Sequence, residues 1–336
     1  MARKRIYLAY TGGTIGMQPS SEGYVPRAGY LAQALAAMPE LDRLEMPEVE
    51  LGEYQPLIDS SNMTPENWQQ IADDIVRRYA EFDGFVVLHG TDTMAFTAAA
   101  LAFMFEDLDK PVILTGSQIP LAQLRSDGRE NLLNSLYVAA HYPIAEVGLF
   151  FNNRLLRGCR ATKADAEGFD AFASPNFPPL LDAGIRIRAG AGVVSPGCQR
   201  RVRVQPISSQ PIGVISLYPG ISAAVIRNAV QQPVKALILR SYGVGNAPQT
   251  PDFLDALAEA TARGIVVVNL TQCLRGSVNM GGYATGHGLR QRGVISGGDM
   301  TLEATLAKLH YLLSQQLSAS EITAAFGRSL RGEISL

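Results

Sequence analysis

The sequence contains few cysteines, and this scarcity excludes a fold built on disulfides. Three cysteines occur in 336 residues, namely Cys159, Cys198 and Cys273. Their number is odd and they lie far apart, which is typical of proteins in a reducing compartment. We therefore expect a cytoplasmic protein.

Long apolar runs are also missing. Arg3, Lys4 and Arg5 resemble the charged start of a signal peptide, but the apolar run that follows ends at Thr11 after five residues, too short for an export signal. No later stretch is long enough to span a membrane. The sequence thus predicts neither an export signal nor a membrane anchor.

An excess of one charge sign is absent. The chain has 29 Lys and Arg against 31 Asp and Glu, a net charge of -2. This balance argues against a nucleic-acid or membrane-surface partner and favours small-molecule ligands. The four histidines have no zinc-ligand spacing, so we expect no metal. Neither GxGxxG nor a phosphate-binding loop motif occurs, which disfavours dinucleotide and phosphate binding.

Strand-like and helix-like segments alternate along the chain. In the first half we expect strands at 6–10, 49–57, 84–89, 112–115 and 147–151, with helices at 31–38, 65–79, 93–105 and 131–140. In the second half we expect strands at 212–217, 236–239 and 265–270, with helices at 223–230, 251–262 and 302–316. Such alternation is typical of parallel sheets covered by helices.

The alternation stops between residues 186 and 210, where glycine, proline and scattered arginines replace the periodic pattern. Because the chain also exceeds the usual size of one core, we expect two α/β domains. The larger N-terminal domain, 1–188, has a mostly parallel sheet flanked by helices. A linker spans 189–211, and a smaller parallel α/β domain spans 212–336.

Four polar stretches lie where expected strands end, which is where ligands bind in open parallel sheets. They are AYTGGTIG with Thr14, IDSSNM with Asp59, LHGTDTM with Thr91 and Asp92, and ATKADAEGFD with Lys163. A threonine hydroxyl needs a base to become a nucleophile; a lysine can serve, and an acid can orient that lysine. The set fits acyl transfer from an amide or ester.

Each of these residues also has a simpler interpretation. Thr14 and Asp59 fit polar turns, Thr91 and Asp92 fit the cap of the next helix, and a single lysine is usually a solvated surface charge. Individually, the residues leave both interpretations open.

In combination, TGGTIG and DGFVVLHGTDTM resemble the two signature motifs of the bacterial-type asparaginase/glutaminase family. DSSNMTPENW, GCRATKADAEGFDAFASPNFPPL and the later segments SYGVGNAP and NLTQCLRGSVNMGGYATG extend the resemblance over essentially the whole chain. The sequence is most similar to the cytoplasmic type I L-asparaginases.

The resemblance implies hydrolysis of L-asparagine to L-aspartate and ammonia without a cofactor. It places the nucleophile at Thr14, which forms an acyl-enzyme, and a second catalytic group at Thr91, Asp92 and Lys163. Tyr24 then belongs to a lid over the substrate.

Substrate binding follows from the charges of free asparagine. Asp59 and Asp92 suit its ammonium group, Ser60 and backbone amides suit its carboxylate, and Ser61 occupies a position that is often glutamine in the family.

Two further implications concern the C-terminal domain. Asn246 matches a position that completes the site of a neighbouring subunit, which implies a homo-oligomer built on an intimate dimer, commonly a tetramer. Arg240, Thr271 and Cys273 match a separate regulatory asparagine site; alternatively, Arg240 forms an interface salt bridge and Cys273 is a small buried residue.

Three other functions remain compatible with the motifs. The chain could be a glutaminase, an amide-hydrolysing amidotransferase subunit, or a noncatalytic amino-acid sensor. Binding alone does not require a lysine beside a hydroxyl, which favours an enzyme.

Overall fold

The computed structural model describes residues 3–21, 23–190, 192–194, 201–282 and 284–335. The chain divides into two compact units, Met1–Gln205 and Pro206–Leu336. This division falls within the span 189–211 expected as a linker. Residues 191 and 195–200 of that span, Cys198 among them, lie outside the described residues.

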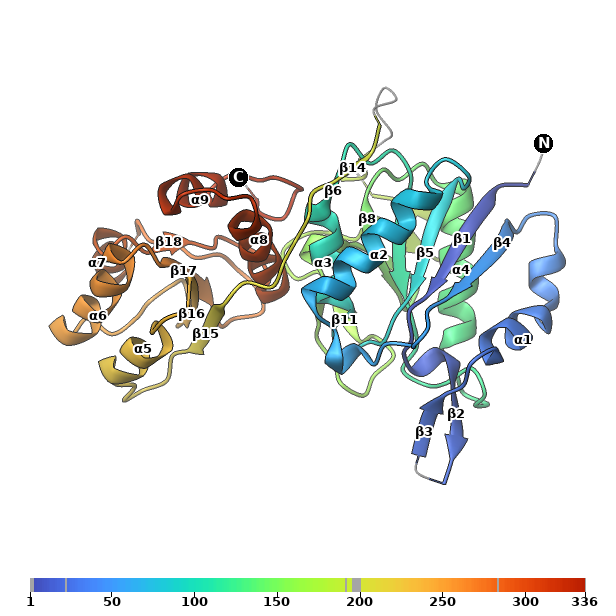
Figure 1. Ribbon diagram of the computed structural model, residues 1–336, viewed down its shortest axis with the longest axis horizontal. Helices are drawn as coiled ribbons and strands as arrows, with labels where there is room; N and C mark the ends of the chain where they lie inside the picture. Colours follow the sequence, from blue (N-terminus) through green and yellow to red (C-terminus); the bar gives the residue numbers. More distant parts are fainter. Residues whose placement is uncertain (1–2, 22, 191, 195–200, 283, 336) are drawn as a thin grey trace. The chain divides into compact units, whose positions relative to one another are not determined.

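An eight-stranded sheet forms the centre of the first unit (Figure 1). Its order is β13-β12-β9-β8-β7-β5-β1-β4. The strands β8, β7, β5, β1 and β4 run parallel, and β9, β12 and β13 run antiparallel at one edge. The bounds are β1 (Arg5–Tyr10), β4 (Glu48–Glu53), β5 (Gly84–Leu88), β7 (Val112–Thr115), β8 (Val147–Phe151), β9 (Arg154–Arg157), β12 (Leu181–Ala183) and β13 (Ile187–Ala189). Every residue of β5, β7 and β8 is buried, as expected for parallel strands covered on both faces.

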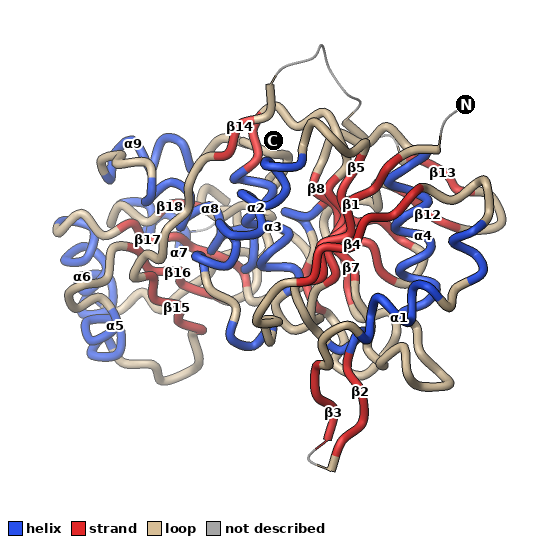
Figure 2. The backbone as a smooth tube through the Cα atoms, turned by 45° about the vertical axis from the view of Figure 1, so that its right-hand side comes forward, coloured by secondary structure: helices blue, strands red, loops and turns tan. Residues whose placement is uncertain are grey.

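Helices cover both faces of this sheet. They are α1 (Tyr30–Ala36), α2 (Pro65–Arg78), α3 (Met94–Met104) and α4 (Gly128–His141). In Figure 2, α2 and α3 lie on one side of the strands and α4 on the other. The helix α3 is apolar on all sides because it packs between the sheet and α2. A capping box at Thr64 begins α2.

Short elements complete the first unit. Its two-stranded sheets pair β2 (Met17–Ser20) with β3 (Gly23–Pro26), β6 (Phe105–Glu106) with β14 (Arg203–Val204), and β10 (Thr162–Lys163) with β11 (Phe172–Ala173). Its 3₁₀ turns are η1 (Thr14–Gly16), η2 (Pro39–Asp42), η3 (Ser60–Asn62) and η4 (Gly158–Arg160). The expected strand over 49–57 is too long: β4 ends at Glu53, after which Tyr54 and Ile58 donate backbone hydrogen bonds to Tyr10 and Thr11.

The second unit contains a four-stranded parallel sheet, in the order β15-β16-β17-β18. Its elements are β15 (Ile212–Ser216), α5 (Ala223–Ala229), β16 (Ala236–Ser241), α6 (Pro251–Ala262), β17 (Val266–Thr271), α7 (Ala284–Gln291), β18 (Ile295–Ser296), α8 (Leu302–Ser314) and α9 (Ala319–Phe326). The helices α5 and α6 pack together, and α8 and α9 contact β16 and β17. Two α/β units, the larger with a mostly parallel sheet, confirm the predicted fold class.

A buried ion pair ties the C-terminal segment to α8. Lys308 Nζ lies 2.6 Å from Glu333 Oε1, and both side chains are fully buried. The same ammonium donates hydrogen bonds to the carbonyl oxygens of Phe326 and Arg328. Burial raises the pKa of Glu333, but the charge and hydrogen bond of Lys308 outweigh that effect and lower it overall. The cost of burying these two charges is therefore offset by their ion pair and by the hydrogen bonds of Lys308.

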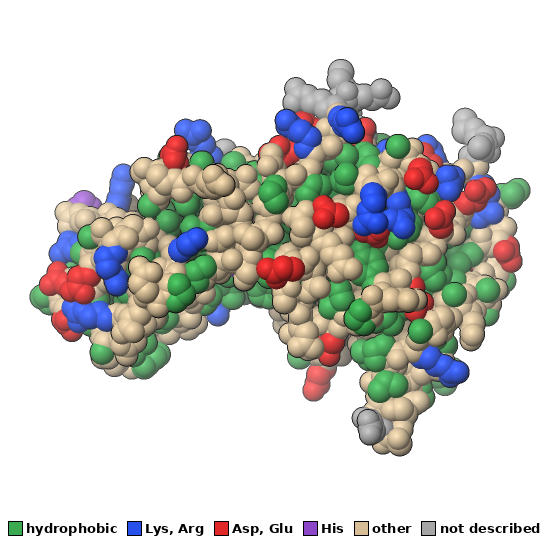
Figure 3. Space-filling model, viewed as in Figure 1, with side chains coloured by type: hydrophobic (Ala, Val, Ile, Leu, Met, Phe, Trp, Pro, Cys, Tyr) green, Lys and Arg blue, Asp and Glu red, His purple; other side chains and the backbone are tan. Residues whose placement is uncertain are grey.

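The surface carries charges of both signs. On the face shown in Figure 3, Lys and Arg side chains are interspersed with Asp and Glu side chains. Within the described ranges, none of the helices combines the length and apolar character needed to cross a bilayer.

Candidate active site

The loops that follow β4, β1, β5 and β7 meet at one edge of the larger sheet. These strands are parallel neighbours, so their carboxyl ends coincide. Hydrogen bonds join the loops directly. Thr11 donates to the Leu88 carbonyl from both its backbone N and Oγ1, and Thr93 Oγ1 donates to the Ser60 carbonyl at 2.7 Å. The polar stretches that follow these strands therefore lie together at this edge of the sheet.

Glycines allow these loops to approach closely. Gly13 has φ +94°, and a Cβ added to it would collide with the backbone of Gly90. A Cβ on Gly90 would in turn collide with Ser60 Oγ. The turn after β1 thus needs glycine both for its backbone conformation and for its contact with the turn after β5.

Thr14 is the first residue of η1 and is half-buried, while Ile15 beside it is fully buried. Ile15 belongs to the hydrophobic core of the first unit, which anchors the turn. Its carbonyl also accepts a hydrogen bond from Leu121 N at 3.1 Å. Thr14 is thereby presented at the edge of the sheet.

Thr91, Asp92 and Lys163 form a connected group. Lys163 Nζ donates to Thr91 Oγ1 at 3.0 Å and to Asp92 Oδ1 at 2.7 Å. The side chain of Lys163 is 21% exposed and that of Asp92 is 66% exposed. Lys163 is placed by β10, where it pairs with Phe172 of β11. The helix α3 begins at Met94, so Thr91 and Asp92 precede its N-cap residue.

A series of buried side chains linked by hydrogen bonds ends at His89, two residues before Thr91. Trp68 Nε1 donates to Thr97 Oγ1 at 3.1 Å, and Thr97 Oγ1 lies 2.9 Å from His89 Nε2. His89 Nδ1 lies 2.7 Å from the Gly90 carbonyl oxygen, which only accepts, so Nδ1 carries the proton and Nε2 accepts from Thr97. Complete burial lowers the pKa of His89 to about 4, so this histidine is neutral near pH 7.

The expected substrate-binding residues Asp59, Ser60 and Ser61 lie in the loop after β4. Asp59 Oδ1 accepts a hydrogen bond from Ser61 N at 2.9 Å, which shapes η3. Ser60 is buried against Gly90, whereas Asp59 and Ser61 are exposed. The loop therefore brings a hydroxyl and a carboxylate to the same edge as Thr91.

Tyr24 lies on the hairpin formed by β2 and β3, opposite Pro19. The residue is 45% exposed. Among the described contacts, no hydrogen bond joins Tyr24 to Thr14. The segment expected to be a lid is therefore an exposed hairpin, and residue 22 at its tip lies outside the described residues.

Gln118 is a site residue that the sequence analysis did not single out. It follows β7 and accepts a hydrogen bond from Thr91 Oγ1 at 3.0 Å. The signal that could have found it is the one that points to Thr14 and Thr91, namely a polar residue just after a buried strand.

The second unit holds the remaining predicted residues. Arg240 and Thr271 lie near the carboxyl ends of the paired strands β16 and β17. Cys273 follows, with its backbone N donating to Thr271 Oγ1 at 3.0 Å; it is exposed, so the alternative of a small buried residue is wrong. Among the described residues, the buried Nε atom of Arg240 has no hydrogen-bond partner. These three residues are thus brought together. Asn246 forms a β-bridge with Tyr242.

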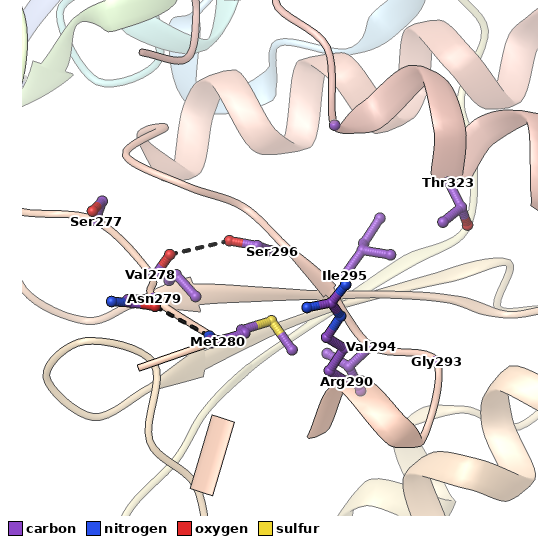
Figure 4. Close-up of a pocket in the computed structure, with 12 residues that line it drawn as sticks. Ser277, Val278, Asn279, Met280, Arg290, Gly293, Val294, Ile295, Ser296 and Thr323 are labelled. Atoms are coloured by element: carbon purple, nitrogen blue, oxygen red, sulfur yellow. Dashed lines mark hydrogen bonds between the residues drawn. The ribbon is translucent and has the colours of Figure 1, made fainter. Parts of the chain in front are cut away.

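A different cavity of the second unit contains none of the predicted residues (Figure 4). Its volume is about 730 Å³, and it is lined by loop 277–281, Arg290 at the end of α7, residues 293–296 and Thr323 of α9. In the parts of the chain that the structure covers, no three His, Cys, Asp or Glu side chains are grouped to hold a metal ion.

Comparison with known proteins identifies the family of this chain. The model "Asparaginase, N-terminal" matches residues 5–192, and "Glutaminase/Asparaginase C-terminal domain" matches residues 211–326. L-asparaginase 1 of Escherichia coli (strain K12) is 66% identical over 334 residues, 99% of each chain.

Solved structures match the fold of this chain along essentially its full length. L-asparaginase I from Vibrio cholerae has a TM-score of 0.94 at 61% identity, covering 100% of both chains. The thermostable L-asparaginase from Thermococcus kodakarensis has a TM-score of 0.89 at 30% identity, covering 99% of both chains. With both of its domains matched in sequence and its fold matched throughout, this chain belongs to the asparaginase family.

Proposed function

We propose that this chain hydrolyses L-asparagine to L-aspartate and ammonia. The observation that carries the proposal is the Lys163 ammonium, which contacts both Thr91 Oγ1 and Asp92 Oδ1 at the sheet edge that also presents Thr14. A hydroxyl beside a lysine and a carboxylate suits acyl transfer and has no evident use in simple binding.

In the proposed reaction, the Thr14 hydroxyl attacks the side-chain amide carbon of asparagine. The C–N bond then breaks, ammonia leaves, and an ester joins the aspartyl group to Thr14. A water molecule, activated by the group of Thr91, Lys163 and Asp92, attacks this ester and releases aspartate with a free Thr14 hydroxyl. No cofactor takes part.

Substrate recognition is proposed to use charge. The exposed Asp92 carboxylate and Asp59 suit the ammonium group of free asparagine, and Ser60, Ser61 and nearby backbone N–H groups suit its carboxylate.

A direct test compares Thr14→Val with Thr14→Ser. Valine keeps the shape of threonine without the hydroxyl, and serine keeps the hydroxyl. Ammonia release from asparagine should fall by at least about 10³-fold in Thr14→Val and by less in Thr14→Ser. Glutamine measured in parallel gives the substrate preference. If Thr14→Val retains more than about a tenth of the wild-type rate, Thr14 is not the nucleophile.

We also propose a regulatory asparagine site at Arg240, Thr271 and Cys273. The support is that they converge at the carboxyl ends of neighbouring strands and that the buried Nε of Arg240 has no hydrogen-bond partner within the part of the chain that the structure describes. Sigmoidal kinetics in the wild type should become hyperbolic in Arg240→Ala and stay sigmoidal in Arg263→Ala. Hyperbolic wild-type kinetics would exclude regulation.

The proposed assembly is a homo-oligomer built on an intimate dimer, commonly a tetramer, in which Asn246 completes the site of a neighbouring subunit. The proposed location is the cytoplasm, in line with three scattered cysteines.

A further inference from the structure

Gln118 connects Thr91 to the segment that carries Lys163. Its Oε1 accepts a hydrogen bond from Thr91 Oγ1 at 3.0 Å. Its Nε2 donates to the carbonyl oxygens of Ala166 and Gly168, each at 3.2 Å. Because these two residues follow Lys163 closely in the chain, the hydrogen bonds form a closed circuit from Lys163 through Thr91 and Gln118 back to the Lys163 segment.

The chemistry of the groups fixes the direction of each bond. The carbonyl oxygens of Ala166 and Gly168 only accept, so the amide NH₂ of Gln118 faces them and its Oε1 faces Thr91. An amide oxygen also only accepts, so Thr91 donates its single proton to Gln118. A lysine ammonium only donates, so Thr91 Oγ1 offers Lys163 a lone pair. The proton of Thr91 therefore points away from Lys163.

The backbone of Gln118 is itself held in place. Its N–H lies 3.0 Å from both carboxylate oxygens of Asp127, and Ile119 N donates to Asp127 Oδ1 at 3.0 Å. Asp127 directly precedes α4. Since a rigid helix supports the backbone, the side chain loses little further freedom when it binds Thr91.

We propose that Gln118 is a positioning residue for the hydrolysis, keeping the Thr91 hydroxyl turned so that its proton faces away from Lys163 and its lone pairs face Lys163. This inference rests on the proposed function. Once the Lys163 ammonium has released one proton to solvent, the Thr91 proton stays on Gln118, so the lone pair of the Lys163 amine is free to take a proton from the attacking water.

The ionisable surroundings of Lys163 are simple in the described part of the chain. Asp92 is its ion-pair partner, Asp165 and Glu167 follow on the same segment, and Arg125 lines the cavity that Gln118 shares with Glu167. The two elements packed against β10, namely α3 and β11, contain no ionisable side chain. A shift in pH dependence after a change at Gln118 is therefore simple to interpret.

Two variants separate the effects of the amide. Gln118→Met keeps the length of the side chain and removes its hydrogen bonds. Gln118→Glu keeps an acceptor for Thr91 and adds a negative charge, but its second oxygen cannot donate to the carbonyl oxygens of Ala166 and Gly168. A cavity of about 500 Å³ borders Gln118, so both side chains have room.

In Gln118→Met, kcat should fall roughly tenfold or more with little change in KM, because the Thr91 hydroxyl is no longer oriented. The acid limb of the kcat profile should move to lower pH by about half a unit, because the freed Thr91 proton can turn toward Lys163 and disfavour its charged form. In Gln118→Glu, the added negative charge should move the limb to higher pH by a similar amount.

The matched control is Gly168→Ala. Its added Cβ would meet the Asp165 carboxylate, so this change disturbs the same segment without removing a charge and without touching Thr91. Its acid limb should keep the wild-type midpoint. Equal midpoints in all four proteins would overturn the proposal and leave Gln118 as a support for the segment alone.

A second measurement does not depend on activity. Acetylation of Lys163 by acetic anhydride, followed by mass spectrometry across pH, reports the fraction of free amine. Its midpoint should shift down in Gln118→Met and up in Gln118→Glu, and identical midpoints would refute the role of Gln118. If the wild type released no ammonia from asparagine, the proposed function would fail, while this measurement would still decide the role of Gln118.

Discussion

Single residues at the sheet edge have little freedom to change. Gly13 must lie against Gly90, and His89 must stay neutral between Thr97 and the Gly90 carbonyl. Both constraints act on the same turn, the one that carries Thr91. Their effects on stability and activity can be measured separately.

Gly13→Ala should reduce both stability and activity. Its Cβ would meet the Gly90 backbone, and its φ of +94° is strained for alanine. We expect a loss of unfolding free energy above about 2 kcal/mol and at least a tenfold loss of kcat, measured by urea unfolding and ammonia release. Gly264→Ala is the control: its φ of +82° is similar and its Cβ would meet nothing within 4 Å. If both variants lose equal stability, the close approach to Gly90 has no cost.

His89 should make folding sensitive to mild acid. Its pKa is about 4 in the folded protein, below its ordinary value of 6.5, so the unfolded chain binds more protons between these two values. The stability linked to neutral His89 is therefore fully present above about pH 6.5 and is lost as the pH falls toward 4. The loss in unfolding free energy should reach ~2 kcal/mol near pH 4.5.

The measurement is urea unfolding of wild type and His89→Gln near neutral pH and near pH 4.5. Glutamine does not titrate, so the wild type should lose more stability than the variant on acidification. Equal losses in the two proteins would show that His89 already accepts a proton in the folded state.

Much of the site was predictable at the level of single residues. Thr14 and Thr91 each follow a buried strand in the sequence, Ser60 follows the edge strand β4, and the structure places all three on loops joined at one edge of the sheet. The grouping of Lys163 with Asp92 was expected from the family resemblance and not from any local pattern, because the two residues lie 71 positions apart in the sequence. Gln118 carried the same signal as Thr14, but its contact with Thr91 depends on how the amide is turned.

At the scale of elements, long periodic segments were predicted and short edge elements were not. The strands at 112–115 and 147–151 and the helix at 251–262 have the predicted bounds, since their apolar patterns are continuous. The span 186–210, expected to lack regular structure, contains β13 and β14. Strands of two or three residues depend on a neighbouring strand for pairing, and a local pattern does not indicate that neighbour.

The hairpin of β2 and β3 is the element whose contribution to activity is simplest to test. Tyr24→Phe should lower kcat roughly tenfold without changing thermal stability, because the hydroxyl of an exposed residue contributes little to folding. Val25→Ala, a change at a neighbouring exposed residue, controls for changes in the hairpin itself. A wild-type kcat in Tyr24→Phe would remove the hydroxyl from the reaction.

At the scale of the whole molecule, the proposed sharing of sites between subunits makes a prediction about mixed assemblies. Thr14→Val and Asn246→Ala should each be nearly inactive alone. When equal amounts are unfolded together and refolded, a mixed dimer contains one site with both defects and one intact site. Ammonia release should return to about a quarter of the wild-type value if pairing is random. If the mixture is no more active than its parts, each chain has a self-contained site.

The buried pair of Lys308 and Glu333 limits how this protein can be engineered. A chain cut before Glu333 would leave the Lys308 ammonium enclosed without a counter-charge, a defect of ~3–5 kcal/mol. Shortened expression versions should therefore keep residue 333, and an affinity handle is better attached at the other end of the chain.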